Sequence, residues 1–137
     1  MRFTNTITVQ RPQSEVFAYL ADLSHLPEWN YALADTRLVT PGPVGVGSRY
    51  RQRRTVPVHT EETLEITEFV PDEKLTVRGT LNSFPAELTY SLHPTDNGTT
   101  VVNTVTLHVS GLRSLLTAPI KSAVAANLAV LAQVLAP

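Results

Sequence analysis

The stretch from Leu112 to Leu135 constrains the fold of this chain more than any other part of it. Large apolar side chains recur there every three or four positions, at Leu112, Leu116, Ile120, Val124, Leu128, Leu131 and Leu135. This spacing draws one stripe along an α-helix. Most of the preceding sequence has the patterns typical of strands. A long apolar helix that follows a set of strands indicates a helix packed on a concave sheet, with an internal cavity between them.

Two interpretations of the start of this helix remain open. Thr117 could cap a helix that carries Pro119 in its first turn, or one longer helix could continue through Pro119 with a kink. The outer side of the helix carries Val130 and Val134 among alanines. That side is apolar enough to predict a contact in a homodimer.

Before the C-terminal helix, one strand, two short helices and about six further strands are expected. The first strand covers residues 3–9 and is followed by helices within residues 12–21 and 22–29. Turn residues then separate strands over 34–40, 48–56, 59–69, 75–80, 84–92 and 99–109. Asn97-Gly98 is the clearest hairpin signal, because both residues suit positive φ. The order predicts an α+β class with an antiparallel sheet, and residues 1–137 as a single domain.

Composition excludes several kinds of site. A net charge of −1 and a pI near 6.4 provide no basic field for nucleic acid. The chain has no cysteine, so disulfides and thiolate metal sites are excluded, as is typical of a cytoplasmic protein. The N-terminal residues show no apolar signal core. The uncharged stretch from Ser122 to Ala136 falls short of the about 20 residues that span a bilayer, so no membrane span is expected.

Four motifs, spread over the whole chain, carry a family resemblance. They are Pro12-x-x-Glu15-Val16-Phe17-x-x-Leu20-x-Asp22 with Leu26-Pro27-Glu28-Trp29, then Gly45-x-Gly47-Ser48-x-Tyr50, Glu65-Ile66-Thr67-Glu68-Phe69-x-Pro71, and Gly98-Thr99-Thr100-Val101-Val102. Their order and spacing resemble the Bet v 1-like, START-related superfamily (SRPBCC), and most of all its polyketide cyclase/dehydrase and lipid-transport group. The resemblance implies a helix-grip fold, with about seven strands curved around the C-terminal helix and a hydrophobic cavity between them. It implies no shared reaction, and it assigns no catalytic residue here.

Strand alternation indicates which polar residues face the cavity. Tyr50, Gln52 and Arg54 share one face, and the register of the next strand places Glu62 and Thr60 inward. A buried arginine and carboxylate are costly unless they pair, so an Arg54–Glu62 ion pair at the cavity wall is predicted. Alternatively, the two residues lie beyond the helix as a surface pair, or a bulge turns both outward. The predicted ligand-binding residues are Trp29, Tyr31, Tyr50, Arg54, Glu62, Phe84, Tyr90, Asn103, Val105, Val124, Leu128 and Leu131.

Three arginines, Arg49, Arg51 and Arg53, alternate on the opposite face of their strand. They form either a solvated face balanced by acidic residues, which the charge pattern favours, or a site for an anionic headgroup.

The residues for catalysis are less well defined. His25, His59, His93 and His108 are candidates by type, but none stands at metal-ligand spacing to another, so no metal and no cofactor are expected. The function predicted is binding of an apolar or aromatic small molecule, lipid-like or polyketide-like. One alternative is a cofactor-independent cyclase or dehydratase that uses the same pocket. The other is an interaction module whose cavity is filled by side chains.

Overall fold

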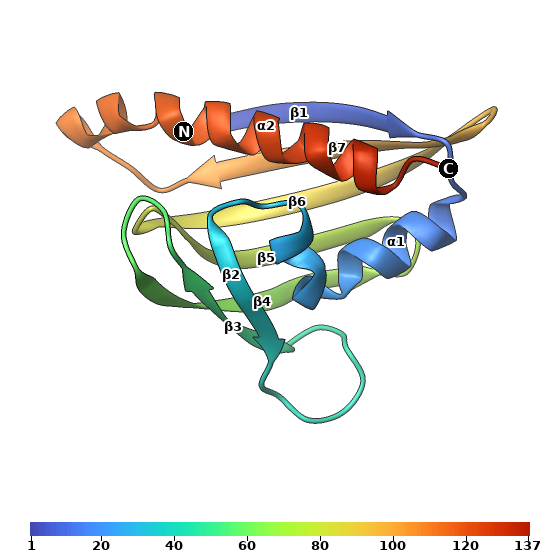
Figure 1. Ribbon diagram of the computed structural model, residues 1–137, viewed down its shortest axis with the longest axis horizontal. Helices are drawn as coiled ribbons and strands as arrows, with labels where there is room; N and C mark the ends of the chain where they lie inside the picture. Colours follow the sequence, from blue (N-terminus) through green and yellow to red (C-terminus); the bar gives the residue numbers. More distant parts are fainter.

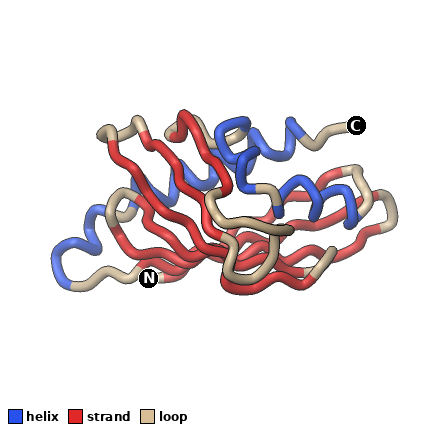
Figure 2. The backbone as a smooth tube through the Cα atoms, turned by 90° about the horizontal axis from the view of Figure 1, so that it is seen from below, coloured by secondary structure: helices blue, strands red, loops and turns tan.

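The computed structural model describes residues 1–137, and one seven-stranded antiparallel sheet dominates it (Figure 1). Across the sheet the strands run in the order β1-β7-β6-β5-β4-β3-β2. The perpendicular view in Figure 2 shows the strands as a bent layer with the C-terminal helix lying across it. The predicted α+β helix-grip architecture is therefore confirmed. The strands are β1 (Arg2–Val9), β2 (Leu33–Leu38), β3 (Arg49–Arg54), β4 (Thr60–Val70), β5 (Lys74–Leu81), β6 (Phe84–Thr95) and β7 (Gly98–Leu107).

The helices follow the predicted order. They are α1 (Gln13–Ala21), the 3-10 helix η1 (Leu23–Glu28), the 3-10 helix η2 (Gly111–Leu116) and α2 (Ala118–Val134). Pro12 precedes α1, and Asp22 links the two short helices by accepting a hydrogen bond from the Ser24 backbone N–H at 3.1 Å. Arg11 donates to the carbonyls of Leu135 and Ala136, each at 2.9 Å. These bonds satisfy carbonyls that have no partner within the helix, and they tie the end of α2 to the end of β1.

The C-terminal apolar stripe is not one helix, and this part of the prediction is wrong. The chain forms η2, then starts α2 at Ala118 with Pro119 in its first turn. Proline fits a first turn because its missing N–H would have no partner there. Leu112 and Leu116 are consequently exposed, whereas Ile120, Leu128, Leu131 and Leu135 are buried. Of the two alternatives, the helix that starts after Thr117 with Pro119 in its first turn is correct. The Thr117 hydroxyl, however, donates to the Ser114 carbonyl and does not cap α2.

The β6–β7 hairpin differs from the expected turn chemistry. Between β6 and β7, Thr95 pairs with Gly98, so the turn is Asp96-Asn97 and neither residue has positive φ. The predicted Asn97-Gly98 turn is therefore wrong by one residue. The β5–β6 hairpin instead uses positive φ, at Asn82 (49°) and Ser83 (72°), as a two-residue I′-type turn requires.

The interior is divided into two apolar clusters. The larger one gathers α1, η1 and the second half of α2 on the sheet, and it includes Trp29, Tyr50 and Leu131. The smaller one consists of Phe84, Ala86, Val105, Leu107 and Ile120. Leu88 and Val124 are only partly buried and pack against both clusters. The space between the two clusters is where the cavity lies.

By length and composition, one helical stretch resembles a membrane span. Gly111–Val134 has 24 residues and a mean hydropathy of 1.6. Only 28% of its apolar window is buried, and this burial includes Ile120, Leu128 and Leu131, which the inner face of α2 supplies to the core. We therefore describe α2 as a helix that packs on the core by one face.

Candidate functional site

A cavity of about 230 Å³ lies between the inner face of the sheet and the first half of α2. Sixteen of its 25 lining residues are hydrophobic, so its wall is mainly apolar. Several lining residues are also exposed at the surface, namely Tyr31, Val56, Pro57 and Pro119. The cavity therefore opens to solvent beside the β3–β4 loop and the start of α2.

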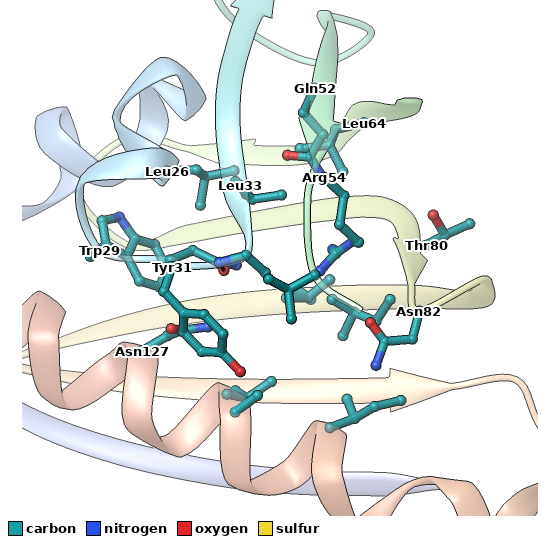
Figure 3. A pocket seen from close by; sticks show the side chains of 18 of the residues that line it. Leu26, Trp29, Tyr31, Leu33, Gln52, Arg54, Leu64, Thr80, Asn82 and Asn127 are labelled. Carbon is teal, nitrogen blue, oxygen red and sulfur yellow. Dashed lines mark hydrogen bonds between the residues drawn. The ribbon is translucent and has the colours of Figure 1, made fainter. Parts of the chain in front are cut away.

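Seven of the twelve predicted ligand-binding residues line this cavity. Arg54 comes from β3, Tyr90 from β6 and Asn103 from β7, so three strands contribute polar groups to one space. Figure 3 shows Arg54 reaching into the space between Tyr31 and Asn82. The full set is Trp29, Tyr31, Arg54, Tyr90, Asn103, Val124 and Leu128.

The other five predicted residues face inward but do not line the cavity. Tyr50 and Leu131 are completely buried in the larger apolar cluster. Phe84 and Val105 are covered by the smaller cluster around Ile120. Glu62 is buried behind Arg54. A residue that faces inward thus does not necessarily line the cavity, because packed side chains can separate it from the open space.

The predicted Arg54–Glu62 ion pair is present and buried. Arg54 Nε donates to Glu62 Oε2 at 3.0 Å, and the two side chains are 5% and 4% exposed. Glu62 also accepts from Gln52 Nε2 at 2.8 Å and from Thr80 Oγ1 at 3.0 Å. Three donors therefore compensate the buried carboxylate. Thr60, expected inward beside Glu62, is exposed because β4 begins there at the sheet margin.

Several polar groups of the cavity have no hydrogen-bond partner within the protein. The Nη atoms of Arg54 make no hydrogen bond, since its only one is from Nε. Asn127 on α2 is buried, lines the cavity and makes no side-chain hydrogen bond. Asn103 pairs in register with Asn5 on β1, yet Asn103 Oδ1 and Asn5 Nδ2 are both buried without partners. Buried polar groups are normally satisfied, so these are available to a ligand or to water.

Tyr90 adds a neutral hydroxyl to the cavity. Its ring packs edge-on to Trp29 with centroids 6.5 Å apart. Burial raises the pKa of Tyr90, and burial likewise raises the pKa of Tyr50 in the adjacent core. A phenol held in its protonated form can donate a hydrogen bond across the whole physiological pH range.

Some lining residues were not predicted, and one of them had a detectable signal. Asn127 interrupts the apolar stripe of α2 three residues after Val124, where a polar side chain is unexpected unless it faces an open space. Thr80 and Asn82 line the cavity because the β5–β6 turn folds beside it. Val56 and Pro57 come from the β3–β4 loop, and loop positions carry no periodicity that would reveal them.

The cavity offers hydrogen-bond donors rather than a nucleophile or a metal site. None of the four histidines lines it, and His25 instead stacks on Tyr19 with ring centroids 4.3 Å apart. No group of three or more His, Asp or Glu side chains is close enough to hold a metal ion. Arg54 and Tyr90 can polarise a carbonyl or stabilise an oxyanion.

The outward arginines have local partners. Arg49 pairs with Glu65 at 3.5 Å and Arg51 with Glu61 at 3.3 Å. Arg53 forms no ion pair. This pattern agrees with the interpretation of a solvated, balanced face.

The comparisons agree with this architecture. A comparison with curated proteins found no match. Among solved structures, a START superfamily protein from Mycobacterium smegmatis has a TM-score of 0.80 at 11% identity, covering 98% of this chain and 96% of its own. The structure of Ara h 8.0201 has a TM-score of 0.67 at 16% identity, and the match covers 96% of this chain and 97% of Ara h 8.0201.

A third structure is the di-domain ARO/CYC StfQ from the steffimycin biosynthetic pathway. Its TM-score is 0.75 at 14% identity, and the match covers 94% of this chain and 48% of StfQ. At these identities the structures show the fold alone. The family model for polyketide cyclase / dehydrase and lipid transport matches residues 1–136, and the chain therefore belongs to that family.

Proposed function

We propose that this protein binds an apolar or aromatic small molecule, lipid-like or polyketide-like, in the cavity between the sheet and α2. The observation that carries the proposal is an open, mainly apolar cavity lined by several polar groups without a protein partner, namely the Nη atoms of Arg54, Asn103 Oδ1 and the Asn127 amide. Small-molecule sites commonly combine an apolar wall with a few polar groups that fix orientation. Arg54, Tyr90, Asn103 and Asn127 would take that second role toward the oxygen atoms of a ligand.

The size of the cavity limits the ligand. A protein cavity of about 150 Å³ accommodates benzene, and this one measures about 230 Å³ and is open at one end. A small aromatic compound or part of an acyl chain fits inside, with the remainder of a longer molecule emerging past Tyr31 and Val56.

A matched pair of helix variants tests this proposal. Ala123 lines the cavity, whereas Ala126 is exposed on the outer side of the same helix. Ala123→Phe should fill the cavity and lower the affinity for anilinonaphthalene sulfonate, an apolar aromatic anion, at least about tenfold. Ala126→Phe should bind the dye like the wild type. Equal binding by both variants would contradict the proposed site.

Native mass spectrometry of the purified protein, followed by denaturing extraction, would identify the chemical class of any ligand that remains bound. Together with the dye experiment, it separates a binding protein from the interaction module. A protein that purifies empty and binds no dye in either form would support a cavity that serves only folding or partner contacts.

A cyclase or dehydratase that uses the same cavity is the second candidate. It is supported by the free Nη groups of Arg54 and the neutral Tyr90 hydroxyl, both placed on the wall of one cavity. Such a reaction would need no cofactor, because positioning of a reactive chain and polarisation of one carbonyl are sufficient. For an enzyme, Arg54→Lys and Tyr90→Phe should abolish turnover of a polyketide substrate with little change in its affinity. For a binding protein, both variants should change affinity alone.

A further inference from the structure

The 3-10 helix η2 presents three leucines to solvent. Leu112, Leu115 and Leu116 are 85%, 75% and 61% exposed, and no residue of η2 is buried. Isolated exposed leucines are ordinary, but three on one six-residue segment form an apolar patch of the kind that marks an interaction site. We call Leu112, Leu115 and Leu116 the leucine tip.

Contacts on the inner side of η2 hold the leucine tip outward. The Arg113 guanidinium lies over the Phe84 ring at 4.7 Å from its centroid. The Ser114 hydroxyl donates to the Gly111 carbonyl at 2.9 Å and thereby closes the turn. The guanidinium contact and the closed turn thus place η2 beside the start of β6, with the three leucines on its solvent side.

The C-terminal segment that contains the leucine tip carries side-chain charges of one sign. No acidic residue follows Asp96, so the last 41 residues carry only Arg113 and Lys121 as permanent side-chain charges. The Lys121 ammonium lies over the Phe3 ring at 5.9 Å from its centroid, beside the start of α2. The whole chain has a net charge of −1, so this C-terminal segment is basic in a slightly acidic molecule.

The leucine tip lies at the same end of the molecule as the mouth of the cavity. In Figure 1, η2, the β3–β4 loop and the β5–β6 turn all lie toward the same end of the long axis, at the left of the view. The β3–β4 loop adds exposed Val56 and Val58, of which Val56 also lines the cavity. Apolar side chains therefore extend from the mouth of the cavity to the molecular surface.

We propose that this end docks on anionic lipid membranes, with the leucine tip inserted among the acyl chains and Arg113 and Lys121 on the headgroups. Apolar side chains flanked by cations are the combination that adsorbs to an anionic bilayer surface. A second copy of the chain fits less well, because a symmetric contact would place Arg113 and Lys121 of both copies on one interface, to which the C-terminal segment supplies no acidic residue. Docking here would let an apolar ligand pass between bilayer and cavity, but the docking itself does not depend on the proposed ligand.

Vesicle cosedimentation tests the proposal directly. Vesicles of phosphatidylglycerol and phosphatidylcholine in equal parts should bind the protein, with binding that weakens as salt is raised. Vesicles of phosphatidylcholine alone should bind it much less. The triple variant Leu112→Ser/Leu115→Ser/Leu116→Ser should lower the affinity at least about tenfold. Each of Arg113→Glu and Lys121→Glu should lower it at least roughly fivefold.

Two control variants match these substitutions elsewhere on the surface. Val46→Ser removes an apolar side chain that is 69% exposed in the β2–β3 loop. Arg53→Glu reverses an exposed arginine on the outer face of the sheet. Both should bind vesicles like the wild type, and the melting temperature of every variant should show that it is folded.

Three results would overturn the proposal. The first is no binding to the anionic vesicles, and the second is binding by the triple variant at wild-type affinity. The third is a concentration-dependent dimer that the triple variant loses, which would assign the leucine tip to a second copy. The Ala123→Phe dye experiment measures ligand binding without vesicles, and its result does not depend on any of these three. Failure of docking and failure of the ligand site are therefore distinguishable.

Discussion

Arg54 and Glu62 form a buried ion pair at 3.0 Å although they are not directly opposite in the β3–β4 ladder. Arg54 is in register with Thr60, and Glu62 with Gln52, so the pair crosses the ladder diagonally. Gln52 and Thr80 hold the carboxylate from its other sides. The arrangement fixes the Arg54 head at the cavity wall, where a ligand would meet it.

Removing the charge of Glu62 should destabilise the protein strongly. In Glu62→Gln the guanidinium of Arg54 stays buried without its carboxylate, and breaking such a pair costs about 3 to 5 kcal/mol. Urea unfolding at neutral pH would measure the loss. The double variant Arg54→Met/Glu62→Leu should recover most of it, because no unpaired charge remains. A double variant less stable than Glu62→Gln would contradict this account.

The sequence predicts the Arg54–Glu62 pair correctly because strand alternation needs only the local pattern of β3 and β4. The sequence also predicts the sheet and α2, because the apolar pattern repeats there over many residues. It does not distinguish Tyr90, which lines the cavity, from Tyr50, which is completely buried. That difference arises from how separate elements pack, and no single strand encodes it.

The leucines of η2 also show that a local sequence pattern does not predict how separate elements pack. Leu112 and Leu116 continue the helical stripe of Ile120, yet they extend beyond the region where the sheet can cover them. Periodicity reports which side chains share a face of a helix. Whether a partner covers that face is a tertiary property.

The stability of the protein should fall with rising pH more steeply than exposed tyrosines would cause. An unfolded tyrosine ionises near pH 10, whereas burial raises the pKa of Tyr90 in the folded state. Above pH 10 the unfolded state therefore binds fewer protons than the folded state, and unfolding becomes easier. Each such tyrosine contributes up to about 1.4 kcal/mol per pH unit.

The variant Tyr90→Phe isolates this contribution. Its free energy of unfolding should decline less than that of the wild type between neutral pH and about pH 11. At neutral pH the cost should be small, since the Tyr90 hydroxyl has no protein partner. Parallel declines for the two proteins would show that Tyr90 ionises freely in the folded state.

Gly98 should not tolerate a side chain. A Cβ atom there would overlap the backbone carbonyl oxygen of Val9, the last residue of β1. Gly98→Ala must therefore push β1 and β7 apart, at a cost of about 1 to 3 kcal/mol in thermal or urea unfolding. Gly45 serves as the control, because a Cβ there meets nothing within 4 Å and its φ is not positive. A similar loss for Gly45→Ala would indicate a general effect of chain entropy instead.

Asn127 should contribute more to ligand binding than to the stability of the empty protein. Its side chain is 6% exposed, lines the cavity and makes no hydrogen bond within the protein. The polar atoms of Asn127 face the open cavity, where water can reach them, so Asn127→Leu should change the free energy of unfolding by less than about 1 kcal/mol. The same variant should weaken binding of any ligand whose oxygen atoms Asn127 would meet. Gln133→Leu, on the exposed side of α2, should change neither quantity appreciably. Urea unfolding and calorimetric titration with the extracted ligand would measure both effects, and unchanged affinity of Asn127→Leu would show that Asn127 does not contact the ligand.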